Sequence, residues 1–257
     1  MKKILKQLVL NVLYVLHPIL PDRKGIAILM YHAVDSSGWE FSITPEMFER
    51  QMRYLRDNKY TFLSLGQVVD MTDGKLPIPA KAVVVTFDDG YMSVATDAAP
   101  IAERYAIPVV LFIHTDQSQK ELGNNLSLLD WEEIKKLRQE GFTIESHSHT
   151  HPNLKKLSRE QIETDLKAVE ETFLQNIGNK PKFFAYPGGK YSIEAVGSLR
   201  SSGYRGAFTI NRGRVMVGDD PFQLKRNGMG RDTSWIEFLV RVSPANDLYE
   251  RIVNFIK

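Results

Sequence analysis

From residue 25 onward, short apolar runs alternate with segments in which apolar residues recur at helical spacing. The apolar runs that we interpret as strands are Ile26–Tyr31, Ala82–Phe87, Val109–Ile113, Phe142–Ser146, Phe183–Tyr186 and Gly206–Ile210. Most are continuous rather than alternating, which is typical of strands covered by helices on both faces. Strands that alternate with helices in this way favour parallel βαβ units.

The helical segments between these runs have readable ends. Thr44 stands before Pro45, which places a capping hydroxyl ahead of a proline at the first helical position. Asp130 and Ser158 are each followed three residues later by Glu or Gln, the spacing of a capping box. Gly178 is a suitable stop for the helix that Ser158 begins.

A chain of 257 residues suits one large α/β domain, and no internal repeat or low-complexity linker divides it. We therefore expect residues 25–257 to form one domain. A barrel of about seven parallel βα units fits this length, and an open sheet is the alternative. In both architectures the active site lies at the carboxyl ends of the strands.

Residues 1–24 differ from the rest of the chain. Lys2 and Lys3 precede an interrupted apolar run, and no small-residue cleavage site follows it. The run is also shorter than the ~20 clean apolar residues of a spanning helix. Three interpretations remain open: a signal peptide, an interfacial or uncleaved anchor helix, which implies peripheral membrane association, and a helix packed on the domain.

Composition narrows the function classes. The net charge of +2, without a cluster of Lys or Arg, gives no argument for a nucleic-acid partner. The absence of cysteine excludes disulfides, thiolate metal sites and a Cys nucleophile. It also fits an oxidising compartment, so a membrane-associated or extracytoplasmic location is favoured. The oligomeric state is left open.

Two adjacent carboxylates, Asp88 and Asp89, follow the second apolar run and precede Gly90. Both cannot be buried without compensation, because repulsion and desolvation raise carboxyl pKa values. A divalent cation held by one of them removes that penalty and leaves the other free for proton transfer. The simpler alternative is an ordinary Asp-Asp-Gly turn.

Two histidines four residues apart, His147 and His151, follow the fourth apolar run. With Asp89 they make a set of two imidazoles and one carboxylate, which is typical of a catalytic metal with open positions. One divalent ion is expected, with zinc favoured and Co, Ni or Fe acceptable. His149 points the other way in an extended backbone, so packing is its simpler role.

Other candidates are less specific. His32 and His114 end strands, where they could line the same site or serve only in packing. Trp131 begins a helix as either a lid or a core residue. Tyr186-Pro187 opens a rigid turn whose amides could face an oxyanion, although a plain turn is simpler.

At these residues the sequence resembles the polysaccharide deacetylases of carbohydrate esterase family 4, the NodB-homology domain. Residues 86–91 (TFDDGY) match the first motif, 147–152 (HSHTHP) the second, and 185–189 (AYPGG) more loosely the third. The resemblance covers about residues 26–230. It implies a deformed (β/α) barrel and metal-dependent removal of acetyl groups from sugar polymers of the cell envelope.

The resemblance also implies roles for the matching residues. Asp88 would be the general base. Asp89, His147 and His151 would be the metal ligands. The backbone N–H of Tyr186 would help to hold the oxyanion.

Further roles follow from the resemblance and from two departures from it. Trp131 would form part of the apolar wall around the acetyl methyl group. The arginine of the third motif is missing, and Arg226 is the proposed substitute that positions Asp88. No histidine follows His151, so the usual late acid has no match. The segment around His32 instead resembles the circularly permuted branch that acts on poly-N-acetylglucosamine, which makes His32 the expected acid.

The expected reaction is hydrolysis of N-acetyl groups on an acetylated GlcNAc polysaccharide, with release of acetate. Asp88 would take the proton of the attacking water, and a protonated His32, its pKa favoured by nearby carboxylates, would protonate the leaving amine. Alternatives are an esterase for O-acetylated xylan, a carbohydrate-binding relative without activity, and an amidase for small cyclic amides.

Overall fold

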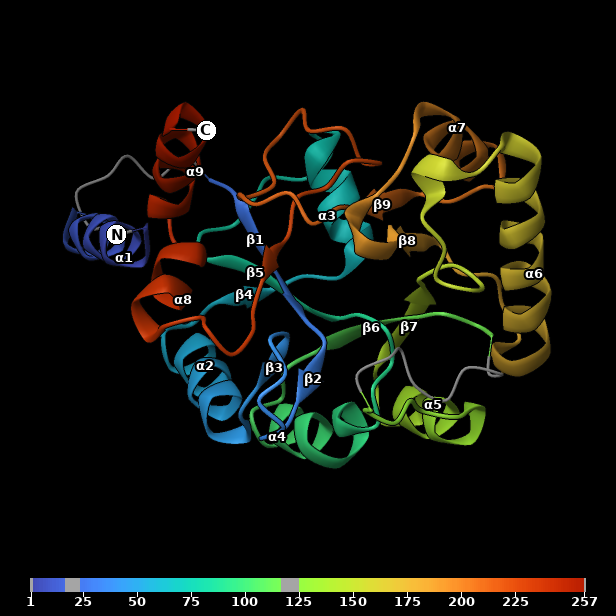
Figure 1. Ribbon diagram of the computed structural model, residues 1–257, viewed down its shortest axis with the longest axis horizontal. Helices are drawn as coiled ribbons and strands as arrows, with labels where there is room; N and C mark the ends of the chain where they lie inside the picture. The colour runs from blue at the N-terminus through green and yellow to red at the C-terminus, as the bar shows by residue number, and fades with distance from the viewer. Residues whose placement is uncertain (1, 17–23, 117–124, 257) are drawn as a thin grey trace.

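The computed structural model describes residues 2–16, 24–116 and 125–256. A curled, mostly parallel sheet occupies the centre, and helices surround it (Figure 1). Its main strands are β1 (Ile26–Tyr31), β5 (Ala82–Phe87), β6 (Val109–Ile113), β7 (Thr143–Ser146), β8 (Phe183–Ala185), β9 (Gly206–Phe208) and β10 (Asn227–Gly228). Their order is β10-β1-β5-β6-β7-β8-β9, and β4 (Thr61–Phe62) pairs with β5. The predicted strands are thus confirmed, the last three being one or two residues shorter.

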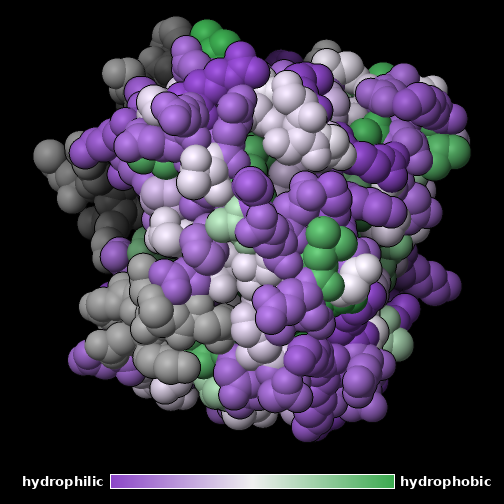
Figure 2. All heavy atoms as spheres, turned by 90° about the vertical axis from the view of Figure 1, so that its right-hand side faces the viewer, coloured by the Kyte–Doolittle hydropathy of each residue, from purple (hydrophilic) through white to green (hydrophobic). Residues whose placement is uncertain are grey.

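The helices are α1 (Lys2–Leu16), α2 (Pro45–Asp57), α3 (Leu65–Thr72), α4 (Ala99–Arg104), α5 (Trp131–Gln139), α6 (Arg159–Ile177), α7 (Ile193–Ser201), α8 (Trp235–Arg241) and α9 (Ala245–Ile256). Shorter elements are η2 (Val94–Ala98), η3 (Leu154–Lys156), η4 (Pro187–Gly189) and the small sheet of β2 (Ala33–Val34) and β3 (Ser42–Ile43). Thr44 caps α2, and Asp130 and Ser158 form the predicted capping boxes of α5 and α6. The face on the α6 side of the molecule is largely hydrophilic, as expected for helices that bury only one side (Figure 2).

Alternation along the strands separates two apolar clusters. On β1 and β5, Ile28 and Val84 belong to a cluster inside the curled sheet. Their neighbours Leu29 and Val85 belong to the cluster beneath the surrounding helices. Because side chains alternate along a strand, every second residue beyond Ile28 and Val84 also points inward. The inward positions just past the ends of β1 and β5 are therefore His32 and Asp88.

One C-terminal segment joins the two edges of the sheet. Leu224 bridges to Phe208 of β9, and Asn227 pairs with Leu29 of β1. Arg226 lies between these two attachments and is completely buried. The structure is therefore an α/β deformed barrel, as predicted, and this segment brings Arg226 into its interior.

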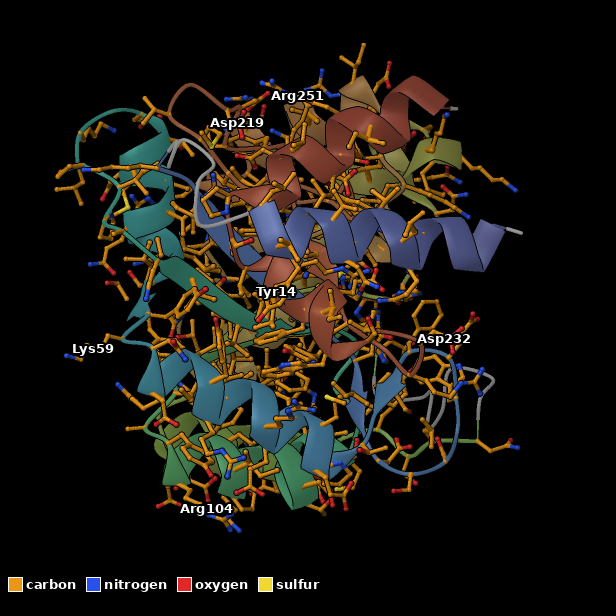
Figure 3. The ribbon with its side chains drawn as sticks, turned by 90° about the vertical axis from the view of Figure 1, so that its left-hand side faces the viewer. Tyr14, Lys59, Arg104, Asp219, Asp232 and Arg251 are labelled. Carbon is orange, nitrogen blue, oxygen red and sulfur yellow. The ribbon has the colours of Figure 1, made fainter. Side chains whose placement is uncertain are left out.

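Helix α1 lies against α8 and α9, the C-terminal helices drawn in red (Figure 3). It buries Leu10 and Leu13, whereas Leu8 and Val15 are 59% and 73% exposed. Lys6 forms an ion pair with Glu237 of α8 at 2.8 Å. Among the residues that the structure describes, no helix is long and apolar enough to cross a membrane. Peripheral membrane association stays a prediction.

Candidate active site

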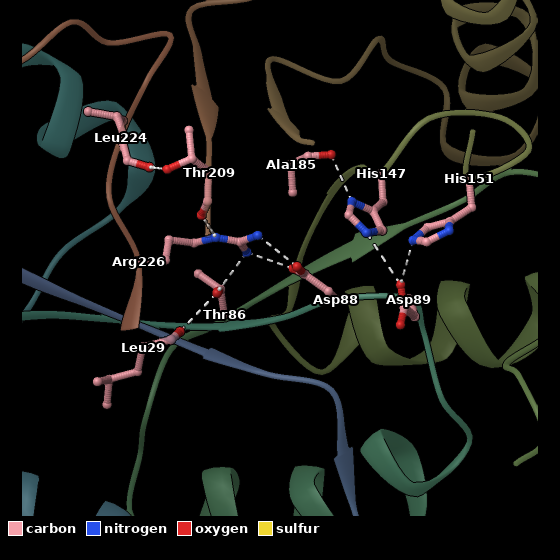
Figure 4. Close-up of polar contacts among 10 residues, drawn as sticks. All are labelled: Leu29, Thr86, Asp88, Asp89, His147, His151, Ala185, Thr209, Leu224 and Arg226. Carbon is pink, nitrogen blue, oxygen red and sulfur yellow. Dashed lines mark hydrogen bonds and ion pairs between the residues drawn. The ribbon is translucent and has the colours of Figure 1, made fainter. Parts of the chain in front are cut away.

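Asp88 is held by a two-pronged ion pair. Both of its carboxylate oxygens lie 2.7 Å from a guanidinium nitrogen of Arg226, Oδ1 from Nη1 and Oδ2 from Nη2 (Figure 4). The arginine is fixed in turn because its Nε donates to the carbonyl of Thr209 at 3.0 Å. Burial alone would raise the pKa of Asp88, but the opposing effects, led by the charge of Arg226 and including its hydrogen bonds, outweigh it and lower the pKa. Asp88 is therefore an ionised carboxylate of fixed orientation, and the predicted contact with Arg226 is present.

The next residue turns its carboxylate in another direction. Asp89 has φ of 73° and Gly90 φ of 83°, so the chain leaves β5 through two left-handed residues. This conformation is unfavourable for a residue with a side chain, by about 1–2 kcal/mol, and such strain is concentrated at functional sites. It allows neighbouring carboxylates to serve separate tasks: Asp88 faces Arg226, and Asp89 faces His147 and His151 (Figure 4).

Three ligand atoms converge at Asp89. Its Oδ1 lies 3.3 Å from Nε2 of His147 and 3.4 Å from Nε2 of His151. Nδ1 of His147 lies 2.7 Å from the carbonyl of Ala185, which can only accept, so Nδ1 carries the hydrogen. In the neutral ring Nε2 then presents a lone pair towards a carboxylate oxygen that is buried and without a hydrogen-bond partner among the described residues. A bound cation satisfies all three atoms, so the set fits a divalent metal.

The loop that carries His151 is fixed by its own backbone. Ser148 and His151 both have positive φ, at 74° and 56°. The amide of His151 donates to the Ser148 hydroxyl at 3.0 Å, and the amide of His149 donates to Asp165 of α6. The ring of His149 is turned to the hydroxyl of Thr115 at 2.8 Å. The sequence prediction that His149 is not a ligand agrees with this placement.

His32 lies beside Asp88, since it continues the register in which Tyr31 pairs with Phe87. Its Nδ1 is buried and has no hydrogen-bond partner in the described part of the chain. Burial lowers the pKa of His32 and outweighs the opposing charges of Asp89 and Asp88. The carboxylates do raise the pKa of His32, as expected, but desolvation is the larger effect and the net shift is downward.

His114, for which the sequence left open a place in this site or a role in packing, is 2% exposed. It continues the register in which Ile113 pairs with Ser146, so it lies beside His147. Both of its ring nitrogens are buried without a partner among the residues described, and burial lowers its pKa to about 4. Phe112 belongs to the inward-facing cluster, so His114, two residues further on, lies on the same inner face.

The role expected for Tyr186 is contradicted. Its backbone N–H donates to the carbonyl of Phe208 at 3.0 Å, continuing the ladder between β8 and β9. Its side chain is buried, and its hydroxyl donates to the carbonyl of Phe222. This amide is therefore not free for an oxyanion. Pro187 begins the turn η4 as expected, but it has no N–H to offer.

Trp131 begins α5 and packs edge-on against Phe173 of α6, with ring centroids 6.2 Å apart. This contact belongs to the apolar cluster beneath the helices, so a part for Trp131 in the wall around an acetyl group stays a prediction.

An aromatic group around His32 is a feature that the sequence did not suggest. Phe41 lies with its ring centroid 5.2 Å from that of His32, and Trp39 lies 5.2 Å from Phe41.

Comparison with known proteins places this site in a family. A family model described as "Polysaccharide deacetylase" matches residues 75–207, just over half of the chain. The protein named "Putative polysaccharide deacetylase YxkH" of Bacillus subtilis (strain 168) is 29% identical over 202 residues, which cover 78% of this chain and 70% of that protein. The poly-beta-1,6-N-acetyl-D-glucosamine N-deacetylase of Staphylococcus aureus (strain MRSA252) is 25% identical over 207 residues, covering 71% and 70%.

Solved structures agree with the sequence comparisons. IcaB from Ammonifex degensii superposes with a TM-score of 0.78 at 27% identity and covers 85% of this chain and 97% of that one. The Streptococcus pyogenes deacetylase PplD, solved in complex with acetate, gives 0.76 at 25% identity and covers 86% and 99%. Taken with the clustered Asp89, His147 and His151, these findings show that the chain belongs to the polysaccharide deacetylase family.

Proposed function

We propose that the protein is a metal-dependent hydrolase that removes N-acetyl groups from a GlcNAc-containing polysaccharide and releases acetate. The observation that carries the proposal is the placement of an arginine-held Asp88 beside the cluster of Asp89, His147 and His151. A similar protein is named a poly-beta-1,6-N-acetyl-D-glucosamine N-deacetylase, which supports this substrate class.

The cluster of Asp89, His147 and His151 would hold the metal, and zinc suits two imidazoles and one carboxylate. When bound, such an ion polarises a carbonyl and makes water more acidic. Asp88 would accept the proton of the attacking water. Its fixed ion pair with Arg226 keeps it ionised and aimed, so it needs no reorganisation during the reaction.

His32 would protonate the leaving nitrogen, because an amine is expelled poorly from an amide without a proton. Burial keeps its pKa low, so the ring is mostly neutral in the resting protein. Its adjacency to Asp88 in the β1–β5 register supports a proton passing between them during the reaction. The imidazole then acts as an acid only while it carries that proton.

The amide that faces the oxyanion is reassigned in this proposal. The N–H of Tyr186 is taken by Phe208, and Pro187 has none. The next amide along the turn belongs to Gly188, at the second position of η4, where a helical turn leaves N–H groups without an internal partner. We assign the oxyanion contact to Gly188.

The test is acetate release from N-acetylglucosamine oligomers by the purified protein, before and after treatment with a chelator and after zinc is added back. We expect acetate release to be lost after chelation and to recover when zinc is added back. Activity that is indifferent to chelation would contradict metal dependence. Acetate released from acetylated xylan but not from the oligomers would contradict the N-acetyl substrate.

A glutamine at His32 separates the amide from the ester reaction. An alcohol leaves without a proton far more easily than an amine, so His32→Gln should abolish acetate release from the amide and largely spare that from an ester. General acid catalysis is typically worth about 10²–10⁴ in rate. Full amide activity in this variant would remove His32 from the mechanism.

A further inference from the structure

A cleft of about 360 Å³ opens beside His32. Its lining includes His32, Phe41, Ile210 and Arg212, and none of the three metal ligands. This volume is at the lower end of ligand pockets, which span about 300–1,000 Å³. The cleft therefore suits a ligand the size of one sugar ring.

Two apolar side chains of the cleft face solvent. Phe41 is 44% exposed and Ile210 is 45% exposed, although both lie next to a buried catalytic centre. Exposed Arg212 and Glu40 line the same space and supply polar groups. An aromatic face with polar groups around it matches a pyranose ring, which has an apolar C–H face and hydroxyl groups at its edge.

The loop that presents Phe41 is held in place. The Phe41 ring packs against His32 and Trp39, and Trp39 packs on the buried Tyr91 with ring centroids 5.2 Å apart. The carboxylate of Asp35 receives hydrogen bonds from within the same loop, at 2.7 and 3.0 Å. The platform is therefore preorganised, which reduces the entropy lost when a ligand stacks on it.

The other end of the loop is tied to the C-terminal segment. The amide of Arg231 donates to the carbonyl of Glu40, and the neighbouring Asp232 also lines the cleft. Figure 3 shows Asp232 beside the loop between β2 and β3. Both walls are thus fixed to one another, so the cleft is part of the folded structure.

The position of the cleft follows the direction of the proposed reaction. In the proposed reaction the acetyl group would face the cluster of Asp89, His147 and His151, and the amide nitrogen would face His32. Whatever bears that nitrogen must continue past His32, where the cleft begins. We propose that this cleft binds the pyranose ring that carries the scissile amide, with the C–H face of the ring stacked on Phe41. The inference rests on the proposed function and makes Phe41 a specificity-determining residue for ring-borne amides.

The experiment is isothermal titration of the metal-loaded protein with a glucosamine oligomer, the product, so that binding is measured without turnover. Aromatic stacking predicts that Phe41→Ala weakens the affinity about three- to tenfold. Phe41→Trp should restore it, because the indole keeps a flat apolar face. The matched control is Leu76→Ala, since Leu76 is 40% exposed and lies outside the cleft.

The outcomes separate this inference from the proposed function. Unchanged affinity in Phe41→Ala, an equal loss in Leu76→Ala, or no binding by the unaltered protein overturns the cleft assignment. If Phe41→Ala binds more weakly but the unaltered protein releases no acetate from acetylated oligomers, the cleft stands and the proposed function fails. If acetate is released and KM for the oligomers is the same in Phe41→Ala, the function stands and the cleft assignment fails.

Discussion

Replacing Arg226 with methionine tests the buried ion pair at the centre of the site. Methionine keeps much of the side-chain length but leaves Asp88 as a charge that is 3% exposed and has lost both bonds of 2.7 Å. Removing one partner of a buried pair typically costs about 3–5 kcal/mol. We expect a decrease of that size in the free energy of unfolding, measured by urea denaturation.

Activity should fall in the same variant. Without the guanidinium, burial becomes the dominant influence on Asp88 and raises its pKa, so that part of the protein carries a protonated, misdirected base. Loss of a positioned base is worth about 10²–10⁴ in rate. The assay is acetate release at saturating oligomer.

Two further variants separate the loss of the ion pair from other effects of the substitution. Asp88→Asn combined with Arg226→Met removes the charge together with its partner, so stability should partly recover while activity does not. Arg200→Met is the matched control, because Arg200 and Asp220 also lie 2.7 Å apart but are 49% and 35% exposed. Such surface pairs contribute about 0–1 kcal/mol. If Arg226→Met lost no more stability than Arg200→Met, or kept activity within about tenfold, our account of the pair would be refuted.

Three other changes test the rest of the site and its frame. His147→Ala should lose both activity and bound metal, and elemental analysis that finds normal metal content would remove it from the ligands. Burial lowers the pKa of His114 from 6.5 to about 4. As the pH falls from 6.5 to about 4, the His114 imidazole is therefore protonated in the unfolded chain but not in the folded one. In chelated protein, stability should drop by up to ~3 kcal/mol over that window, and urea denaturation of His114→Phe should lack this part of the slope. Gly189→Ala would place Cβ 2.3 Å from the Ile210 side chain and should lower the free energy of unfolding by about 1–3 kcal/mol. Gly203→Ala is the control, because Gly203 has a similar φ but open space around it, so this change measures backbone strain alone. Equal losses of stability in the two variants would exclude the clash.

The sequence predicted what depends on local pattern. Continuous apolar runs identified β1 and β5, and capping residues identified the starts of α5 and α6, because these signals act within one element. The spacing of His147 and His151 was also a local signal. Their convergence with Asp89 could be predicted because the carboxyl ends of parallel strands meet at one edge of a sheet. Arg226 was proposed as the partner of Asp88 only because the third family motif lacks its usual arginine in this sequence.

The predictions that failed concern contacts between elements that are distant in the sequence. The amide of Tyr186 is used by the neighbouring strand β9, and no local signal reveals which ladder bonds continue past a strand end. The pKa of His32 is lowered mainly by its burial in the folded protein, which its local sequence does not reveal. The short β10 has too few residues to carry a pattern, although its pairing with Leu29 fixes the arginine that holds Asp88.

The segment that joins the two edges of the barrel has a consequence for the order of assembly. Asp88, Asp89, His147 and His151 all precede residue 207, where the family match ends, but the partner that aligns Asp88 comes later in the chain. During synthesis, the cluster of Asp89, His147 and His151 therefore leaves the ribosome before the arginine that orients Asp88. If the proposed function holds, Asp88 would reach its working orientation only after the C-terminal segment has docked.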